Sequence, residues 1–287
     1  MKIYIPHKTN SGVNGGATFW RNIINGLSDR VHFVDELTDC DILFIASPMA
    51  VEKEEVMQAK RSGKKIVLRV DNIPRKSRNK RNTPHERMKE YATLADVVVY
   101  QSEWARDYCY PLCGDGTVIY NGVNGSIFYP PTEPKEDIYL FAYHGKNEHK
   151  GFWNAHYIFQ QEFRKNKNAW FYFIYDFRSE LEELKNANFD FWNGEKYLHY
   201  PVITDPTEMA DLMRRCKYFI YPSIADASPN VVLEAKACGC EVIGYPDKKM
   251  SGTAELLDPK LDISLERMCD EYFGVFTLVL QAGMIEV

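Results

Sequence analysis

The sequence predicts an α/β protein built from two doubly wound parallel-sheet domains. Three observations lead to this fold class: a length of 287 residues, an alternation of short β-rich runs with longer helical patterns, and one proline-rich break near the middle. A chain of this length exceeds most single domains. Strands that alternate with helices are typical of parallel sheets covered by helices on both faces.

The first half of the chain contains the β-rich runs that would form one sheet. They are KIYI (2–5), VHFV (31–34), DILFIA (41–46), KIVLRV (65–70), DVVVY (96–100) and TVIY (117–120). The next segment, YPPTEPKED, combines three prolines with three acidic residues and is typical of a turn-rich linker. We therefore predict an N-terminal domain over 1–131 and a C-terminal domain over 132–287.

The second half repeats the alternation and would form a second sheet. Its β-rich runs are IYLFAY (138–143), WFYFIY (170–175), KYLHYPV (196–202), YFIY (218–221) and EVIGY (241–245). Ligands of doubly wound sheets bind beyond the carboxyl ends of the strands. Functional residues are therefore expected in the loops that lead from a strand to a helix.

The composition argues against several classes of protein. A net charge of −5 differs from the basic character of nucleic-acid binders, so nucleic acid is not an expected partner. The first residues lack the pattern of an export leader, and no apolar run reaches the length of a membrane span. The seven cysteines are odd in number and scattered through apolar segments, as in a reduced protein. We expect a cytoplasmic protein.

The segment after YFIY predicts a helix with a ligand-binding start. Ser228 is the predicted N-cap, Pro229 the first helical residue, and Gly239 the residue just past the end. The free N–H groups of residues 229 to 231, which include Asn230 and Val231, would attract a phosphate.

Glu234 lies on the apolar side of this predicted helix. Lys236 is only two residues away, and side chains at that spacing do not meet on a helix. Glu234 therefore needs another partner, and a carboxylate at this place in the helix can accept hydrogen bonds from the ribose hydroxyls of a nucleotide. Asp226, in the preceding loop, could take hydroxyls of a sugar beyond the phosphate, or it could be an ordinary loop acid.

Two stretches resemble glycosyltransferases of the GT-B type, in particular retaining glycosyltransferase family 4. Residues 222–246, with PS, the spaced acidic pair, P-N-V-V-L-E-A, A-C-G-C and V-I-G, resemble the donor-site signature of that family. The family has Glu at both acidic positions, whereas Asp226 occupies the first here. IYNGVNGSIFYP (119–130) resembles the family's N-G-V-D…F-x-P element, with Asn124 in place of Asp. The resemblance implies two Rossmann-like domains that face each other across a cleft, and a C-terminal helix that crosses back to the first domain.

The resemblance also assigns roles to two further loops. In HGKNEHKGF (144–152), Lys150 matches a lysine that binds the donor pyrophosphate, while the family's arginine is missing and His144 or Lys146 could replace it. A solvated basic turn is the alternative. In SGVNGGATFW (11–20), Gly15 and Gly16 would allow close approach of the backbone to the donor phosphates or the acceptor.

The segment RVDNIPRKSRNKR (69–81) holds an acid at a strand end and then a basic run. Asp71 stands near the position of a family histidine and could bind the acceptor hydroxyl, assist its deprotonation, or cap a turn. The basic run could hold an anionic acceptor or the surface of an anionic membrane, or it could be a solvated loop. Its residues are Arg75, Lys76, Arg78, Lys80 and Arg81.

Two further patterns receive structural interpretations. DCD (39–41) matches the metal-binding D-x-D of another glycosyltransferase fold, but its second Asp only enters a predicted strand, so we do not interpret it as a metal site. The resemblance implies that helix ends and cations take the place of a metal, so we expect no metal and no other cofactor. The apolar tail from residue 270 is too short to span a bilayer. Burial on the first domain is our interpretation of the tail, and membrane association is the alternative.

Together these observations predict a retaining glycosyltransferase that moves a sugar from a nucleotide diphosphate sugar to a carbohydrate or lipid-linked acceptor. The alternatives are a protein of this fold that binds a nucleotide sugar or glycan without turnover, and an epimerase or phosphorylase. The predicted catalytic residues are Asp226, Lys150 and Asp71. The predicted donor-binding residues are Gly15, Gly16, His144, Lys146, Lys150, Asp226, Ser228, Pro229, Asn230, Val231 and Glu234.

Overall fold

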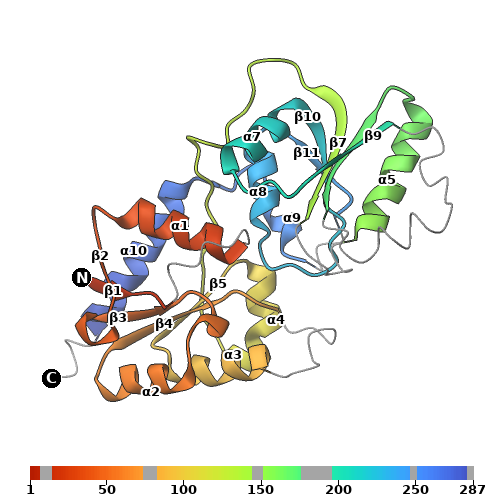
Figure 1. Ribbon diagram of the computed structural model, residues 1–287. Helices are drawn as coiled ribbons and strands as arrows, with labels where there is room; N and C mark the ends of the chain where they lie inside the picture. Colours follow the sequence, from red (N-terminus) through yellow and green to blue (C-terminus); the bar gives the residue numbers. More distant parts are fainter. Residues whose placement is uncertain (7–14, 74–82, 144–150, 176–195, 246–250, 283–287) are drawn as a thin grey trace. The chain divides into compact units, whose positions relative to one another are not determined.

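The computed structural model describes the chain apart from residues 7–14, 74–82, 144–150, 176–195, 246–250 and 283–287 (Figure 1). The chain divides into two compact units. The first unit comprises Met1–Val123, Asp226–Asn230 and Asp258–Val287, and the second comprises Asn124–Ala225 and Val231–Leu257. Each unit contains one parallel sheet.

Within the described residues, the sheet of the first unit has the strand order β2-β1-β3-β4-β5-β6. The direction of winding reverses between β1 and β3, where Ile3 pairs with Ile42. Such a reversal is a topological switch point, and ligands bind beyond the carboxyl ends of the strands on either side of it. The strands are β1 (Lys2–Tyr4), β2 (His32–Val34), β3 (Ile42–Ile45), β4 (Lys65–Val70), β5 (Val97–Tyr100) and β6 (Thr117–Val118).

Helices α1 (Gly15–Leu27) and α10 (Leu265–Ala282) lie side by side on one face of this sheet (Figure 1). Aromatic side chains of both helices pack against Phe44 of β3. The centroid of its ring lies 5.2 Å from that of Phe276 in α10 and 6.1 Å from that of Phe19 in α1. α2 (Lys53–Arg61) and α3 (Thr83–Leu94) cover the other face, and α4 (Glu103–Cys113) follows β5. Short 3-10 turns are η1 (Leu37–Asp39) and η2 (Pro48–Ala50). A late segment of the chain thus completes the core of its first unit.

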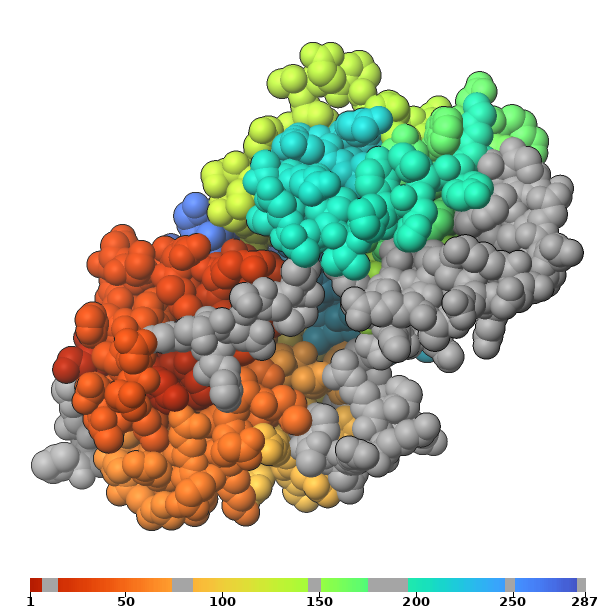
Figure 2. All heavy atoms as spheres, in the orientation of Figure 1, coloured from red at the N-terminus to blue at the C-terminus, as the bar shows by residue number. Residues whose placement is uncertain are grey.

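The sheet of the second unit has the order β11-β10-β7-β8-β9 within the described residues. Its switch point lies between β7 and β10, which pair through Tyr139 and Tyr218. α5 packs an aromatic cluster against the sheet, and α7, teal in Figure 2, contacts β7 and β10. The elements are β7 (Glu136–Tyr143), α5 (Phe152–Lys165), β8 (Trp170–Tyr175), β9 (Lys196–Tyr200), α7 (Pro206–Arg215), β10 (Cys216–Ile220), α8 (Asn230–Ala237), β11 (Glu241–Ile243) and α9 (Thr253–Leu256).

The predicted fold class is confirmed. Each predicted β-rich run contains a strand, and the two sheets are parallel with helices packed on them. The last two residues of the predicted linker, Glu136 and Asp137, already belong to β7. Among the helices that the structure describes, none combines the length and the apolar character needed to cross a bilayer. The predicted tail instead packs into the first unit, where it contributes the buried side chains of Tyr272, Phe276 and Val279 to the core.

Candidate functional site

Two loops meet at the switch point of the second sheet. One follows β7, and its residues 144–150, with His144, Lys146 and Lys150, lie outside the described residues. Gly151, directly after Lys150, has a φ of 74°, and a Cβ there would lie 3.1 Å from Cγ of Pro222. Pro222 belongs to the loop that follows β10. Glycine satisfies both the positive φ and the close approach, so the local sequence brings the two predicted donor loops together.

α8 starts one residue later than predicted, at Asn230, and it ends before Gly239 as predicted. Gly239 has a φ of 75° and its N–H donates to the carbonyl of Lys236, which closes the helix. Ser228 does not cap the helix through its side chain. Among the described residues its Oγ is buried without a hydrogen-bond partner, as is the Oγ of Ser223.

These two hydroxyls are a chemical feature of the loop between β10 and α8. Ser223 and Ser228 lie on either side of Asp226, and both residues are buried. A buried polar group without a partner costs about 1–3 kcal/mol, so native structures seldom leave one unsatisfied. A ligand that brings acceptor oxygens to this loop would remove that cost.

The two predicted acids are half-buried. Asp226 lies in the loop, and Glu234 lies on α8 between the buried residues Leu233 and Ala235. The Nζ of Lys236 donates to the carbonyl of Leu256 at 2.8 Å, at the end of α9. Lys236 therefore joins α8 to the end of α9.

The segment 226–230 belongs with the first unit and is held there by amide groups. The Nδ2 of Asn121 donates to the carbonyl of Ser228 at 3.1 Å and to Oδ1 of Asn230 at 2.7 Å. The Nδ2 of Asn230 then donates to the carbonyl of Gly15 at 3.0 Å. Gly15 and Gly16 begin α1, so the structure brings these predicted residues beside the predicted phosphate-binding segment.

Asp71 follows β4 at the same carboxyl edge of the first sheet. It is half-buried, and its Oδ1 accepts a hydrogen bond from Nδ2 of Asn72 at 2.9 Å. The basic run of Arg75, Lys76, Arg78, Lys80 and Arg81 lies outside the described residues.

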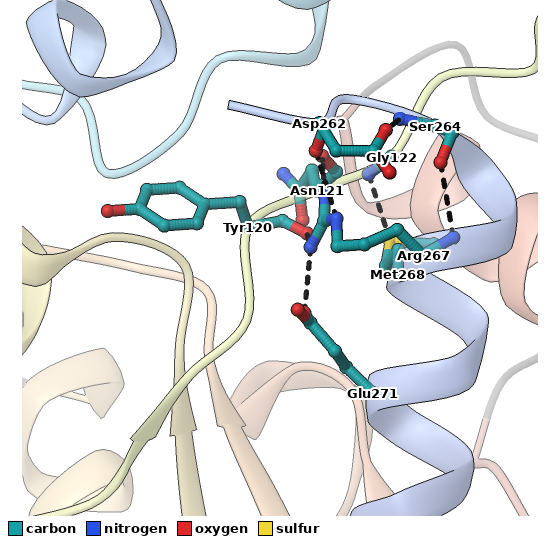
Figure 3. A network of polar contacts seen from close by, with 8 residues as sticks. All are labelled: Tyr120, Asn121, Gly122, Asp262, Ser264, Arg267, Met268 and Glu271. Atoms are coloured by element: carbon teal, nitrogen blue, oxygen red, sulfur yellow. Dashed lines mark hydrogen bonds and ion pairs between the residues drawn. The ribbon is translucent and has the colours of Figure 1, made fainter. Parts of the chain in front are cut away.

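Sequence reasoning recognised the Asn121–Gly122 pair without finding its role. Arg267 of α10 donates to the carbonyls of Tyr120 at 2.9 Å and Asn121 at 3.1 Å (Figure 3). A Cβ on Gly122 would lie 2.6 Å from the carbonyl oxygen of Ser264. This approach requires glycine, and it fixes the backbone of Asn121 so that its side chain meets the start of α8.

The departures from the family pattern also have structural accounts. The Oδ1 of Asn124 accepts hydrogen bonds from the N–H of Ser126 at 3.0 Å and from its Oγ at 2.7 Å. Asparagine makes the same turn as aspartate because both offer this oxygen. In DCD, Oδ2 of Asp41 accepts from the N–H of Lys2 at 2.7 Å and joins the start of β3 to β1.

The described residues contain no cluster of three or more His, Cys, Asp or Glu side chains arranged to hold a metal ion. All seven cysteines are buried free thiols, and burial raises the pKa of Cys240 to about 11. Thiols of this kind are poor nucleophiles and ligands at neutral pH, because the thiolate is the reactive form.

Comparison of the sequence finds no matching family profile and no matching curated protein. Comparison of the structure finds solved proteins of similar fold. HepE of Anabaena, in complex with UDP and glucose, aligns with a TM-score of 0.66 at 14% identity, over 94% of this chain and 88% of HepE. The fold is that of the GT-B glycosyltransferases.

Two further GT-B proteins align over nearly their whole lengths. Sucrose-phosphate synthase from Thermosynechococcus elongatus gives a TM-score of 0.65 at 12% identity, over 99% of this chain and 98% of that one. AviGT4, a glycosyltransferase involved in avilamycin A biosynthesis, gives 0.64 at 14% identity, over 98% of both chains. At these identities the likeness establishes the fold, and the activity has to be argued from the site.

Proposed function

We propose that the chain is a retaining glycosyltransferase that uses a nucleoside diphosphate sugar as donor. The observation that carries the proposal is the meeting of the loops after β7 and β10 at the switch point of the second sheet, together with two buried hydroxyls in the β10–α8 loop that have no partner among the described residues. This is the part of a doubly wound domain where nucleotides bind. HepE has been solved with UDP and with UDP-glucose, which supports uracil as the base to test first.

The residues of this segment suit the parts of such a donor. The first N–H groups of a helix have no partner within the helix and favour an anion, so Asn230 and Val231 would hold the diphosphate. The hydroxyl of Ser228 would donate to the same oxygens. Glu234, four residues into α8, would accept hydrogen bonds from the ribose hydroxyls, and Asp226 would orient the donor sugar.

In the reaction, an acceptor hydroxyl oxygen bonds to the anomeric carbon while the bond from that carbon to the diphosphate oxygen breaks. The bonding electrons leave with the diphosphate, and the acceptor proton passes to a phosphate oxygen on the same side of the sugar. Negative charge grows on the leaving diphosphate, where Lys150 and the start of α8 would stabilise it without a metal. Asp71 would orient the acceptor, a glycan or lipid-linked sugar.

The donor site is tested by thermal unfolding of the purified chain with UDP, GDP, ADP and CMP sugars. A ligand present at a hundred times its Kd adds about 2.7 kcal/mol to the stability. We expect one nucleotide class to raise Tm, and Glu234→Gln to weaken that ligand by roughly 10- to 150-fold, since a hydrogen bond to a charged group contributes about 1.5–3 kcal/mol. Glu241→Gln, at an exposed position on β11, is the matched control and should leave affinity unchanged.

Turnover separates the proposed enzyme from its alternatives. Nuclear magnetic resonance of the product should show the anomeric configuration of the donor in the new linkage. Binding without transfer or donor hydrolysis would instead indicate a protein that only binds nucleotide sugars. A changed sugar in the absence of any acceptor would indicate an epimerase, and a wild-type chain that binds no nucleotide sugar would refute the proposal.

A further inference from the structure

A buried arginine stands at the carboxyl end of β4. Arg69 is only 3% exposed, in a strand whose other central residues are apolar. Its guanidinium lies 3.7 Å from the centre of the Phe19 ring. Burial of a charged side chain costs several kcal/mol unless polar groups compensate for it, so full burial of arginine is rare.

The groups that accept hydrogen bonds from Arg69 are neutral. Its Nη1 donates to the carbonyl of Ala46 at 3.2 Å, and its Nη2 donates to Oε1 of Gln101 at 2.6 Å and to Oδ1 of Asn121 at 3.2 Å. None of these three hydrogen bonds goes to a carboxylate. The first sheet therefore holds a positive charge just below its carboxyl edge.

The charged form of Arg69 persists despite its burial. Burial lowers the pKa of the guanidinium from its usual value, while Tyr272 and Asp71 oppose that shift. Arginine starts from a value so high that it stays protonated in proteins. Asp71, two residues along the chain, is half-buried and is the carboxylate that acts on this charge.

The amide of Asn121 connects this charge to the start of α8. Its Oδ1 faces Arg69, and its Nδ2 faces Oδ1 of Asn230 at 2.7 Å and the carbonyl of Ser228 at 3.1 Å. A charge at one end of an amide polarises the donor at the other end. Arg267 holds the backbone of Asn121 through its carbonyl, as Figure 3 shows, and the hydrogen bonds at both ends of the side chain hold the amide.

We propose that Arg69 is a positioning residue whose buried charge, acting through the Asn121 amide, gives the start of α8 its affinity for a diphosphate. The diphosphate is that of the donor, so the inference rests on the proposed function and extends it to a residue that no ligand touches. The buried hydroxyl of Ser228, which has no partner among the described residues, marks the place where the anion binds.

The test uses inorganic pyrophosphate and the isotopically labelled full chain. Backbone amide signals of Asn230 and Val231 report binding at the start of α8. We expect Arg69→Met to weaken pyrophosphate about tenfold, which corresponds to about 1.4 kcal/mol. Arg69→Lys, which keeps the charge, should recover most of the affinity, and this recovery distinguishes a role of the charge from a role in packing.

Arg30→Met is the matched control. The Arg30 guanidinium also lies over an aromatic ring, 4.0 Å from the centre of Phe273, but it is paired with Asp270. Its replacement should leave pyrophosphate binding unchanged. If circular dichroism shows that Arg69→Met is unfolded, Asn121→Ser replaces it, because this change breaks the amide link while Gln101 still holds Arg69. Asn121→Ser should lower the affinity several-fold.

Three results would overturn the inference: wild-type chain without pyrophosphate-induced shifts at these amides, folded variants that bind as tightly as wild type, or a lysine variant as weak as the methionine one. These outcomes are separate from those for the proposed function. Undiminished binding of a nucleotide sugar by Arg69→Met would leave the donor site standing and remove Arg69 from it. If pyrophosphate binding depends on Arg69 but the chain binds no nucleotide sugar, the role of Arg69 is supported and the proposed donor site is refuted.

Discussion

Replacement of Asn121 by alanine should destabilise the first unit far more than its size suggests. The side chain is 3% exposed and joins Arg69, Gln101, Ser228 and Asn230. Its loss removes one of the hydrogen bonds of the buried guanidinium, which as a charge-assisted bond contributes about 1.5–3 kcal/mol. It also removes the donor to the carbonyl of buried Ser228, at a cost of about 1–3 kcal/mol.

Gln101 still accepts a hydrogen bond from Arg69 and offsets part of the first cost. We therefore expect the free energy of unfolding to fall by about 2–5 kcal/mol in total. Native-state hydrogen exchange measures this effect on the amides of β4 and β5, which the unfolding of the first unit exposes. Asn22→Ala is the control, since within the described part of the chain the Asn22 side chain makes one hydrogen bond, of 3.3 Å, to the carbonyl of Gly122. Equal loss of protection in the two variants would refute the assignment of Asn121 as the centre of this network.

Further changes test the packing around the site. Gly122→Ala should cost about 1–3 kcal/mol in urea unfolding, because its Cβ would lie 2.6 Å from the Ser264 carbonyl oxygen; an unchanged midpoint would mean that this approach relaxes freely. Lys135→Met should lower Tm by several degrees, since its Nζ serves three carbonyls at 2.8–3.1 Å near the end of α7, whereas Lys165→Met on the surface should not. The Cys240 thiol, whose pKa burial raises to about 11, should resist a thiol reagent at pH 8 until denaturant is added, and stability should fall as pH rises from about 9 through 11 because the unfolded chain releases its thiol protons first. Rapid labelling of the native chain would contradict that burial.

The central strands were predictable because each is a short continuous apolar run, which suits a strand that is buried on both faces of a sheet. β3 (ILFI) and β5 (VVVY) lie almost wholly inside the first unit, and their sequences offer no polar face. The end of α8 was predictable for a local reason as well, since Gly239 adopts a left-handed φ that other residues avoid. Short-range chemistry therefore sufficed for the elements and for the loops that join them.

The start of α8 was harder because two local preferences compete there. Ser228 and Pro229 favour a helix that begins at Pro229, yet the carbonyl of Ser228 is held by Asn121, more than a hundred residues earlier in the chain. Tertiary contact thus decides the boundary. The same holds for Arg69, which appears in sequence as one cation in a strand, and whose partners Gln101 and Asn121 converge only when β4, β5 and β6 align in the sheet.

The first unit needs residues from both ends of the sequence, and this has a consequence for biosynthesis. A ribosome releases β1 to β6 well before it synthesises α10, whose Tyr272 and Phe276 close the core around Phe44. For the time needed to translate more than a hundred intervening residues, the nascent sheet presents an uncovered aromatic face of the kind that chaperones recognise. A premature stop codon before residue 265 would leave that face permanently bare, so the truncated chain would be a substrate for quality-control proteases even though the sequence of its donor loop is intact.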